Sequence, residues 1–279
     1  MLISYHTWKD LRDCPKRFRQ LHIYKMTPTV PQNEYFTLYG SLIQKFFENY
    51  CNIWGYKTPN IPPDVVPQWM RQLFDALMLT AEVNWSGPGA SDGPDEIVAK
   101  ASEDANKILA GQSLNYFLNT KSEIGVSIKL SSGHSMTGRM DFVHEDPGKS
   151  ILLFDGKGTS KKGKNIDIDQ LYWYTLLYRF HYGKYPNELG FFYYKLNEFE
   201  PVMFNLDILN EFRARVSLML KSLNENRSFE ATPSAKACRY CPYLNSCPEG
   251  IAGKVSRARP SKAGITAEIT EEGIATFGL

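Results

Sequence analysis

A short apolar run at residues 150–158, SILLFDGKG, ends abruptly in charged residues and glycine. Consecutive large apolar side chains followed by polar residues are typical of a buried central strand whose end opens onto a site. Asp155 and Lys157 are two positions apart, so both project from the same face of such a strand. The run therefore predicts a sheet at the centre of the fold.

The flanking sequence predicts the other layers of the fold. Strands are expected at residues 122–131, 135–146, 150–158 and 188–197. Helices are expected at residues 4–25, 36–56, 68–84, 97–118, 167–182 and 205–224. Ser4 can cap the first helix, and Pro15 marks its end or a kink. Residues 86–96 have the composition of a loop. Helices, then three strands, a helix, a strand and a helix fit an α/β or α+β core with a helical N-terminal portion.

Composition limits the class of protein. The 279 residues are 43% hydrophobic, enough for a full core, and a net charge of +2 means that anionic partners must be met by local patches. No apolar run reaches about 18 residues, so we expect no membrane span. The N-terminus lacks the apolar core of a signal peptide, so we expect the protein to be in the cytoplasm. We expect one domain over residues 1–250, with a helical insertion at about 57–121 and a polar tail at 251–279.

The strand preceding the apolar run carries a second carboxylate. Asp141 lies in GRMDFV, and on paired antiparallel strands it could converge with Asp155. Two carboxylates and the backbone carbonyl of Gly156 make an oxygen-rich site suited to Mg²⁺ or Mn²⁺. A lysine beside that cation can orient water for attack on phosphorus. The alternative is that Asp155 and Lys157 are ordinary strand-end charges, but the buried run beside them favours a site.

Three motifs resemble one known family. GRMD, DGK and QLYWY match, in order and spacing, the G-x-x-D, D-x-K and Q-x-x-x-Y motifs of the PD-(D/E)XK nuclease superfamily, in its RecB-like branch. The resemblance implies a restriction-endonuclease-like α/β fold, with a central mixed β-sheet flanked by helices. It also implies that Asp141 and Asp155 bind Mg²⁺ or Mn²⁺ and that Lys157 assists the attacking water.

The same resemblance gives supporting roles to three further residues. Gln170 and Tyr174 would support the site or the DNA, and their spacing of four places them on one helix face. Ordinary helix packing is the alternative for both. Glu123 matches an acidic residue that the family often has on the strand before G-x-x-D, and we take it as a supporting candidate.

One family residue is replaced. The family usually has a metal-binding histidine in a G-x-x-x-H helix, whereas this chain has Gly40 followed by Gln44. A glutamine carbonyl can still bind Mg²⁺, but it is neutral, so metal affinity, metal preference or activity itself could differ. His134 and His144 flank the GRMD strand and are expected to be turn or surface residues.

Three clustered cysteines, in CRYCPYLNSC, need a fourth ligand to hold a metal. One remote and three local thiolates suit a 4Fe–4S cluster better than zinc, since zinc ribbons usually use two C-x₂-C pairs; zinc or no metal remain open. CPKRF and CRYCPYLNSC resemble the two ends of the iron–sulfur members of this branch. That resemblance implies a cluster joining the chain ends through Cys14, Cys238, Cys241 and Cys247. Cys51 is expected to be a buried core thiol.

Basic and aromatic residues indicate possible nucleic-acid contacts. Lys161, Lys162 and Lys164 follow DGK and could hold a phosphate backbone near the site; solvated loop charges are the alternative. A second basic group, Lys16, Arg17 and Arg19, follows Cys14. Most aromatic residues of the helix at 167–182 are expected in the core rather than as stacking platforms for bases.

The expected function is that of a metal-dependent deoxyribonuclease, an exonuclease acting on single-stranded DNA or duplex ends. Gln44 keeps a second possibility open, a weak or inactive DNA-binding or assembly module on the same iron–sulfur scaffold. A zinc-stabilised binding protein without a nuclease fold is a third. Resemblance to CRISPR-associated exonucleases and helicase-linked nuclease domains implies DNA as a partner, with a helicase, CRISPR or recombination protein as a further one.

Overall fold

The computed structural model describes residues 1–30, 33–54, 61–87, 89–146, 150–163, 166–225, 228–239 and 241–252. The chain forms two compact units. Unit 1 contains Met1–Tyr5 and Asn33–Lys221, and unit 2 contains His6–Gln32 together with the chain from Ser222 onward. The expectation of one domain over residues 1–250 stays a prediction. Most of the tail at 251–279 lies outside the described residues.

Unit 1 is built on a mixed β-sheet. Its strands are β1 (Leu2–Ile3), β2 (Thr120–Lys129), β3 (Ser135–Glu145), β4 (Ile151–Lys157), β5 (Glu188–Tyr193) and β6 (Glu198–Val202). They are ordered β1-β3-β4-β5-β6, and β2 also pairs with β3. The β1–β3 and β4–β5 pairs are parallel, and the remaining pairs are antiparallel. The predicted central strand at 150–158 is β4, in the middle of this sheet.

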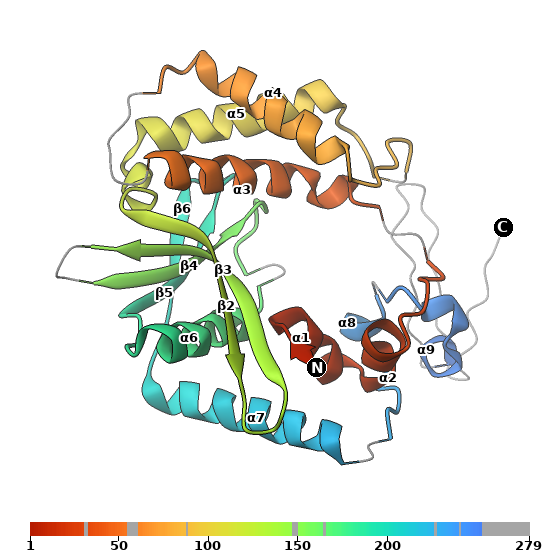
Figure 1. The fold of residues 1–279 in the computed structure, drawn as a ribbon. Helices are drawn as coiled ribbons and strands as arrows, with labels where there is room; N and C mark the ends of the chain where they lie inside the picture. The colour runs from red at the N-terminus through yellow and green to blue at the C-terminus, as the bar shows by residue number, and fades with distance from the viewer. Residues whose placement is uncertain are drawn as a thin grey trace. The chain divides into compact units, whose positions relative to one another are not determined.

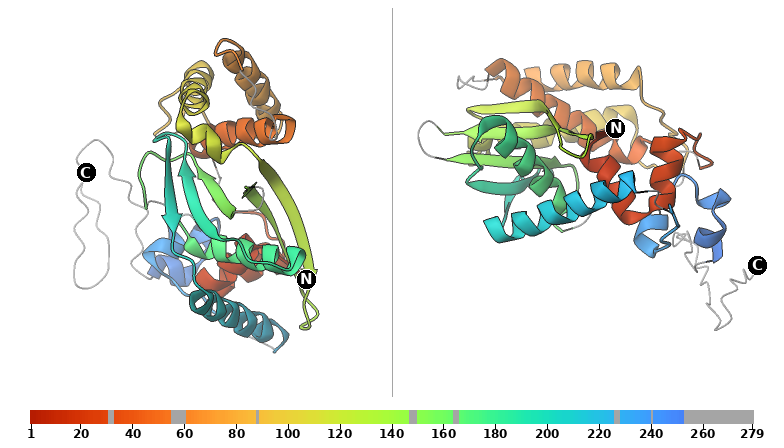
Figure 2. Two further views of the ribbon diagram at one scale, coloured as in Figure 1. Left: turned by 90° about the vertical axis from the view of Figure 1, so that its left-hand side faces the viewer. Right: turned by 60° about the horizontal axis from the view of Figure 1, so that its bottom comes forward.

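Helices cover both faces of the sheet (Figure 1). On one face lie α3 (Tyr35–Trp54), α4 (Val65–Met78) and α5 (Pro94–Ala110). On the other lies α6 (Ile168–Tyr182), with α7 (Leu206–Asn224) packed outside it, as the two views of Figure 2 show. The α/β fold with a mixed sheet between helices is therefore confirmed.

The apolar and aromatic sequence of α6 suits its position between the sheet and α7. Every residue from Leu171 to Tyr178 is buried. Tyr172 packs on Phe212 of α7, while Trp173 donates a hydrogen bond to the carbonyl of Thr137 in β3 (3.0 Å). Four of the six Phe, Tyr and Trp side chains that follow Gln170 in α6 are therefore core residues, as expected. The other two, Phe180 and Tyr182 at the end of the helix, are exposed.

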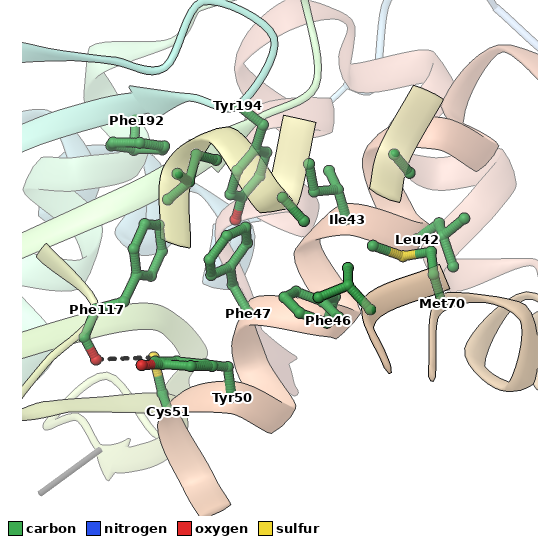
Figure 3. Packing of buried hydrophobic residues seen from close by; sticks show 14 of the residues in the cluster. Leu42, Ile43, Phe46, Phe47, Tyr50, Cys51, Met70, Phe117, Phe192 and Tyr194 are labelled. Carbon is green, nitrogen blue, oxygen red and sulfur yellow. Dashed lines mark hydrogen bonds between the residues drawn. The ribbon is translucent and has the colours of Figure 1, made fainter. Parts of the chain in front are cut away.

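The core beneath α3 is mainly aromatic (Figure 3). Phe47 stacks on Phe117 and on Tyr194, with ring centroids 4.2 and 5.6 Å apart. Cys51 lies one turn further along α3, and its thiol donates a hydrogen bond to the carbonyl of Phe117 (3.5 Å). Burial raises the pKa of the Cys51 thiol. The prediction that Cys51 is a buried core thiol is confirmed.

Several predicted boundaries were wrong. The strand expected at 188–197 ends at Tyr193, where a tight turn leads into β6, which was not predicted. The helix expected at 97–118 runs from Pro94 to Ala110 and is followed by a 3₁₀ helix at Gln112–Tyr116. Pro94 can begin a helix because the first helical position has no intrahelical N–H bond to lose, so the expected loop at 86–96 is shorter.

Unit 2 joins segments from both ends of the sequence. Its N-terminal helix α1 (Tyr5–Asp13) stops before Pro15, as expected, and α2 (Pro15–Phe18) and a π-helix (Arg19–Ile23) follow. The C-terminal segment contains α8 (Ala235–Cys238), a 3₁₀ turn (Leu244–Ser246) and α9 (Pro248–Ala252). The Tyr243 hydroxyl donates to the carbonyl of Met26 (2.6 Å), and Thr232 donates to that of Asp13 (2.8 Å). No helix in the described parts of either unit is long and apolar enough to cross a membrane.

Candidate active site

The candidate site begins where β3 and β4 separate. Their antiparallel pairing ends at Phe142 and Phe154, and the next position in this register would place Asp141 opposite Asp155. Like charges directly opposite each other destabilise a strand pair, which is a physical reason for the pairing to end here. β4 continues to pair with β5 as far as Lys157. The central strand is thus held on one edge and open on the other beside both aspartates.

The neighbouring strand is also irregular at this level. Glu123 of β2 has φ 55°, and the β2–β3 pairing passes over Glu123 and Asp141. Positive φ is rare for a residue with a side chain and usually needs support from its surroundings. Ser122 bonds to the carbonyl of Glu48 in α3, yet the adjacent Glu123 faces the same pocket as Glu48. In a regular strand, the side chains of adjacent residues such as Ser122 and Glu123 would point to opposite faces of the sheet.

A pocket of about 600 Å³ lies between α3 and the separated strands, all within unit 1. Carboxylates of three elements line it, namely Glu48 of α3, Glu123 of β2 and Asp141 of β3. The end of β4 contributes Gly156 and Lys157. Asp155 itself is 2% exposed, so access to the aspartate pair is through Asp141 and Lys157.

Lys157 and Gln170 organise the buried Asp155. The Lys157 ammonium forms an ion pair with Asp155 Oδ2, and Gln170 Nε2 donates to Asp155 Oδ1 (2.7 Å). Lys157 also donates to Gln170 Oε1 (3.4 Å), and Gln170 donates to the Tyr174 hydroxyl (3.1 Å). Four of the residues singled out in the sequence therefore form one connected network from β4 and α6.

The electrostatics of the pocket favour an added positive charge. Burial, the charge of Asp155 and a hydrogen bond shared with Asp155 raise the pKa of Asp141 well above its usual value. Burial and the Glu123 carboxylate likewise raise the pKa of Glu48, although Lys45 opposes this shift with a 3.0 Å hydrogen bond. Without a cation, the raised pKa of Asp141 favours its protonated form beside Asp155.

The donor set suits a hard divalent cation. Asp155 Oδ2 is buried and, apart from its ion contact with Lys157, has no hydrogen bond within the described residues. Asp141 lies beside it, and the backbone carbonyl of Gly156 follows directly along β4. Oxygen donors of this kind are those that Mg²⁺ and Mn²⁺ prefer. Across the described ranges, however, no three His, Cys, Asp or Glu side chains are already arranged as a metal site.

Gln44 reaches the site from α3. The Tyr194 hydroxyl donates a hydrogen bond to Gln44 Oε1, the oxygen that would face a cation. A Cβ atom at Gly156 would lie 2.2 Å from both Gln44 Oε1 and the Tyr194 hydroxyl oxygen, so only glycine fits there. The structure therefore brings Gln44 next to the end of β4, as expected. His144 is instead bonded to the carbonyl of Leu118 (2.7 Å) and does not line the pocket.

The proposed DNA-binding lysines have different surroundings. Lys162 is paired with Glu198 of β6, and Lys161 is exposed in the loop after β4. Lys164 lies outside the described residues. Of the second basic group, Arg17 is buried and binds Asp10 (2.8 Å) and the carbonyl of Ala237 (2.9 Å), so it supports unit 2.

All five cysteines are among the described residues, and they form no disulfide. Cys238 and Cys241 are buried in the small core of unit 2, together with Tyr243 and Leu244. Burial raises the pKa of Cys241, and the nearby Cys14 and Cys238 raise it further, which indicates that these three thiols interact. Cys247 is instead bonded to Glu249 (3.4 Å). In the described part of unit 2 the thiols are not arranged as a metal site, so the structure does not confirm the iron–sulfur cluster.

Three residues at or next to the pocket, Glu48, Tyr194 and Lys195, were missed in the sequence. Glu48 follows Gln44 by four positions on α3, and that spacing, which places two side chains on one helix face, was the available signal. Tyr194 and Lys195 come directly after β5, whose last residue, Tyr193, pairs with Lys157 of β4. No motif marks either of them.

Comparison with known proteins identifies the family. The model of the PD-(D/E)XK nuclease superfamily matches residues 2–248, and the chain belongs to this superfamily. Membership implies a nucleic-acid substrate and a divalent metal cofactor. No curated protein is a significant match to the sequence.

The chain also matches solved structures. A protein of Eubacterium rectale, provisionally described with its crystal structure as an exonuclease, is 15% identical with a TM-score of 0.51, over 95% of this chain and 94% of that chain. SSO0001 is also 15% identical, with a TM-score of 0.42, over 89% of this chain and 86% of its own. At 15% identity, the likeness to the Eubacterium rectale protein concerns the fold alone.

Proposed function

We propose that the chain is a metal-dependent deoxyribonuclease of the RecB-like branch, acting as an exonuclease on single-stranded DNA or duplex ends. The observation that carries the proposal is the position of Asp141 beside Asp155 where β3 and β4 separate, with Lys157 on the same strand end. The provisional description of the Eubacterium rectale protein as an exonuclease supports the mode of action.

In this proposal Asp141, Asp155, the Gly156 carbonyl and the Gln44 side chain would hold Mg²⁺ or Mn²⁺. A cation bound there supplies Lewis-acid polarisation of a phosphoryl oxygen and lowers the pKa of water. Lys157 orients the attacking water and stabilises the negative charge that develops at phosphorus. Gln170 keeps Asp155 and Lys157 in place by bonding both, and Tyr174 fixes Gln170 in turn.

A cleavage assay on end-labelled substrates tests this function. We expect the wild type to shorten labelled single-stranded or blunt duplex DNA in Mg²⁺ or Mn²⁺ and to be inactive in chelator. Asp155→Ala and Lys157→Ala should abolish cleavage while leaving the fold and DNA binding largely intact. Asp75→Ala and Lys129→Ala, which change exposed residues of the same types, are the matched controls. Normal cleavage by both site variants would show that the site is misplaced.

A second candidate function is a DNA-binding or assembly module with little or no activity. It is favoured by Gln44 in place of the usual histidine and by the hydrogen bond that Tyr194 donates to its carbonyl oxygen. The assay above separates the two functions, because a module would bind DNA in every condition and shorten it in none. A helicase, CRISPR or recombination partner belongs to either function and is proposed only from the family resemblance.

We also propose a 4Fe–4S cluster on Cys14, Cys238, Cys241 and Cys247. Support comes from the proximity of Cys14 and Cys238 to Cys241, whose pKa they raise, and from the position of all three in one unit. Iron, sulfide and zinc analysis of protein purified without oxygen tests the cluster. Cys247→Ser should lower iron content, whereas Cys51→Ser, the cysteine in the other unit, should not. Zinc in place of iron, or neither metal, would remove the proposal.

A further inference from the structure

The pocket of unit 1 has two chemically different walls. The carboxylates of Glu48, Glu123 and Asp141 form one, which suits a cation. The other is formed by the first turns of α3 and the turn after β5, with Phe36, Tyr39 and Lys195. No step of the proposed hydrolysis uses this second wall, so its side chains have a different role to explain.

Lys195 is held in the pocket by a tyrosine ring. Its ammonium lies 4.1 Å from the centre of the Tyr39 ring, and the Tyr39 hydroxyl donates to Asp104 (2.8 Å), which fixes the ring. Such a contact is attractive but does not neutralise the charge. Asp92 is the carboxylate on which Lys195 acts electrostatically, and Lys100 already pairs with Asp92 at 2.8 Å.

Lys195 therefore differs from the other lysine of the pocket. Lys157 is paired with Asp155, whereas Lys195 forms no ion pair within the described ranges. Its backbone is fixed because the preceding residue, Tyr194, donates its N–H to the carbonyl of Lys157 (3.1 Å). A positioned ammonium without a carboxylate partner, in a pocket with hydroxyl groups from Thr37, Ser41 and Thr159, suits a phosphate group.

Phe36 supplies a different kind of surface at the same wall. It lies on the first turn of α3, lines the pocket and is 52% exposed. Proteins bind single-stranded nucleic acid with exposed aromatic rings beside basic residues, because the bases stack on the rings and the backbone phosphates pair with the positive charges. In duplex DNA the base faces are covered by their neighbours.

We propose that Phe36, Tyr39 and Lys195 form a strand-binding subsite that selects single-stranded nucleic acid. Lys195 binds a backbone phosphate next to the scissile one, and an unstacked base lies on Phe36. The pocket has a volume of about 600 Å³, within the range of small-molecule sites, which suits one nucleotide of a strand. The inference rests on the proposed nuclease function and deepens it, because a duplex end must separate before its strand can enter.

Binding of fluorescent oligonucleotides by the full chain tests the subsite independently of cleavage. Measurements use Asp155→Asn as the background in Mg²⁺, with single-stranded and blunt duplex probes of one sequence at several salt concentrations. Lys195→Ala should weaken single-strand binding about 5- to 30-fold and reduce the salt slope by about 0.7, the value of one phosphate contact. Lys195→Arg should retain most of the affinity.

Phe36→Ala should weaken single-strand binding about 5- to 150-fold, the loss expected for one stacked base, without changing the salt slope. Lys129→Ala and Phe180→Ala are the controls, since Lys129 is exposed outside the pocket and Phe180 is 53% exposed at the end of α6. Far-UV circular dichroism and melting curves check folding.

The proposal is overturned if Lys195→Ala and Phe36→Ala bind the single strand as tightly as their controls, or if both lose duplex affinity equally. Absence of any nucleic-acid binding by the background protein overturns it as well. If binding follows the expected pattern but the wild type cleaves nothing, the subsite stands and the nuclease proposal fails. The two failures are thereby distinguished.

Discussion

Asp141 and Asp155 occupy the register position directly beyond Phe142 and Phe154, the last pair of β3 and β4. Continued pairing would have placed the two carboxylates face to face in the interior of the sheet, at Cβ distances of about 5 Å. Instead the strands separate, and Asp141 turns toward α3 while Asp155 is held by Gln170 from α6. The separation of β3 from β4 and the pair of carboxylates are thus parts of one structural feature.

Neutralising Asp141 should stabilise the protein in the absence of metal. Burial and the Asp155 charge raise the pKa of Asp141, so the folded state loses stability as pH rises above the ordinary value near 3.8. Asp141→Asn removes that loss at neutral pH. In chelator we expect a melting temperature about 3–8 °C higher, corresponding to about 1–2 kcal/mol.

In the same experiment, added Mn²⁺ should stabilise the wild type but not Asp141→Asn. It should raise the melting temperature of the wild type, because a cation that binds only the folded protein stabilises it, and should leave Asp141→Asn unchanged. Differential scanning calorimetry in chelator and in Mn²⁺ measures both. A variant that melts below the wild type in chelator would show that Asp141 is held ionised by favourable partners.

Gly156→Ala should distort the site. The added methyl group would lie 2.2 Å from Gln44 Oε1 and from the hydroxyl oxygen of the buried Tyr194. Overpacking of this kind costs about 1–3 kcal/mol, and the displaced Gln44 should also weaken metal-dependent cleavage. Gly125→Ala in β2 is the control, because nothing lies within 4 Å of its added atom. Equal urea midpoints and activities for the two variants would contradict the prediction.

Gln44→His should strengthen metal-dependent cleavage, particularly with Mn²⁺. An imidazole is a better ligand for transition metals than a neutral amide oxygen that already accepts a hydrogen bond from Tyr194. We expect the half-saturating Mn²⁺ concentration to fall about tenfold. Tyr194→Phe, which releases the Gln44 oxygen, should shift it in the same direction but less. Metal titrations of activity measure both, and unchanged curves would mean that Gln44 does not contact the cation.

The free energy of unfolding of unit 2 should depend on pH at low pH, because Asp13 is ionised in the folded state. Burial raises the pKa of Asp13, but bonds to Lys9 (2.6 Å) and Arg12 (2.9 Å) outweigh it, and the folded pKa lies below 3.8. The resulting stability is present above pH 3.8 and is lost as pH falls through the folded value. Asp13→Asn should cost about 1–2 kcal/mol at pH 7 and progressively less below pH 4.

Urea unfolding of the wild type and Asp13→Asn at pH 7, 5, 4 and 3 measures this dependence. Asp95→Asn is the control, because the Asp95 side chain is 93% exposed although it pairs with Arg71, and such surface pairs contribute at most about 1 kcal/mol. A difference between wild type and Asp13→Asn that stays constant with pH would exclude the ionised Asp13 as its source.

The sheet and its site were predictable because their signals are local. Three signals lie close together in the sequence: the buried run before Asp155, Asp141 on the preceding strand and Gln170 on the following helix. Pairing of the strands and the crossover helix bring these residues together. The replacement of histidine by Gln44 was also visible. The placement of all four residues in one region agrees with expectation, and their roles stay predictions.

The remaining features depend on packing that no short pattern contains. The left-handed backbone of Glu123 and the pocket position of Glu48 depend on how α3 lies across β2. Strand β6 is short and contains Pro201, which weakened its signal. No motif marks Lys195. Its position depends on the turn after β5, which places its ammonium over the ring of Tyr39.

Unit 2 has a consequence for the order of events during synthesis. Its segment that ends at Gln32 is synthesised before the partners of Asp13 and Met26, which lie after Ser222. At about 5–20 residues per second, that segment waits on the order of ten seconds or longer for its complement. Unit 1 ends at Lys221, so all its strands are synthesised before the second segment of unit 2. The sheet that carries the candidate active site can therefore form before the two segments of unit 2 pair.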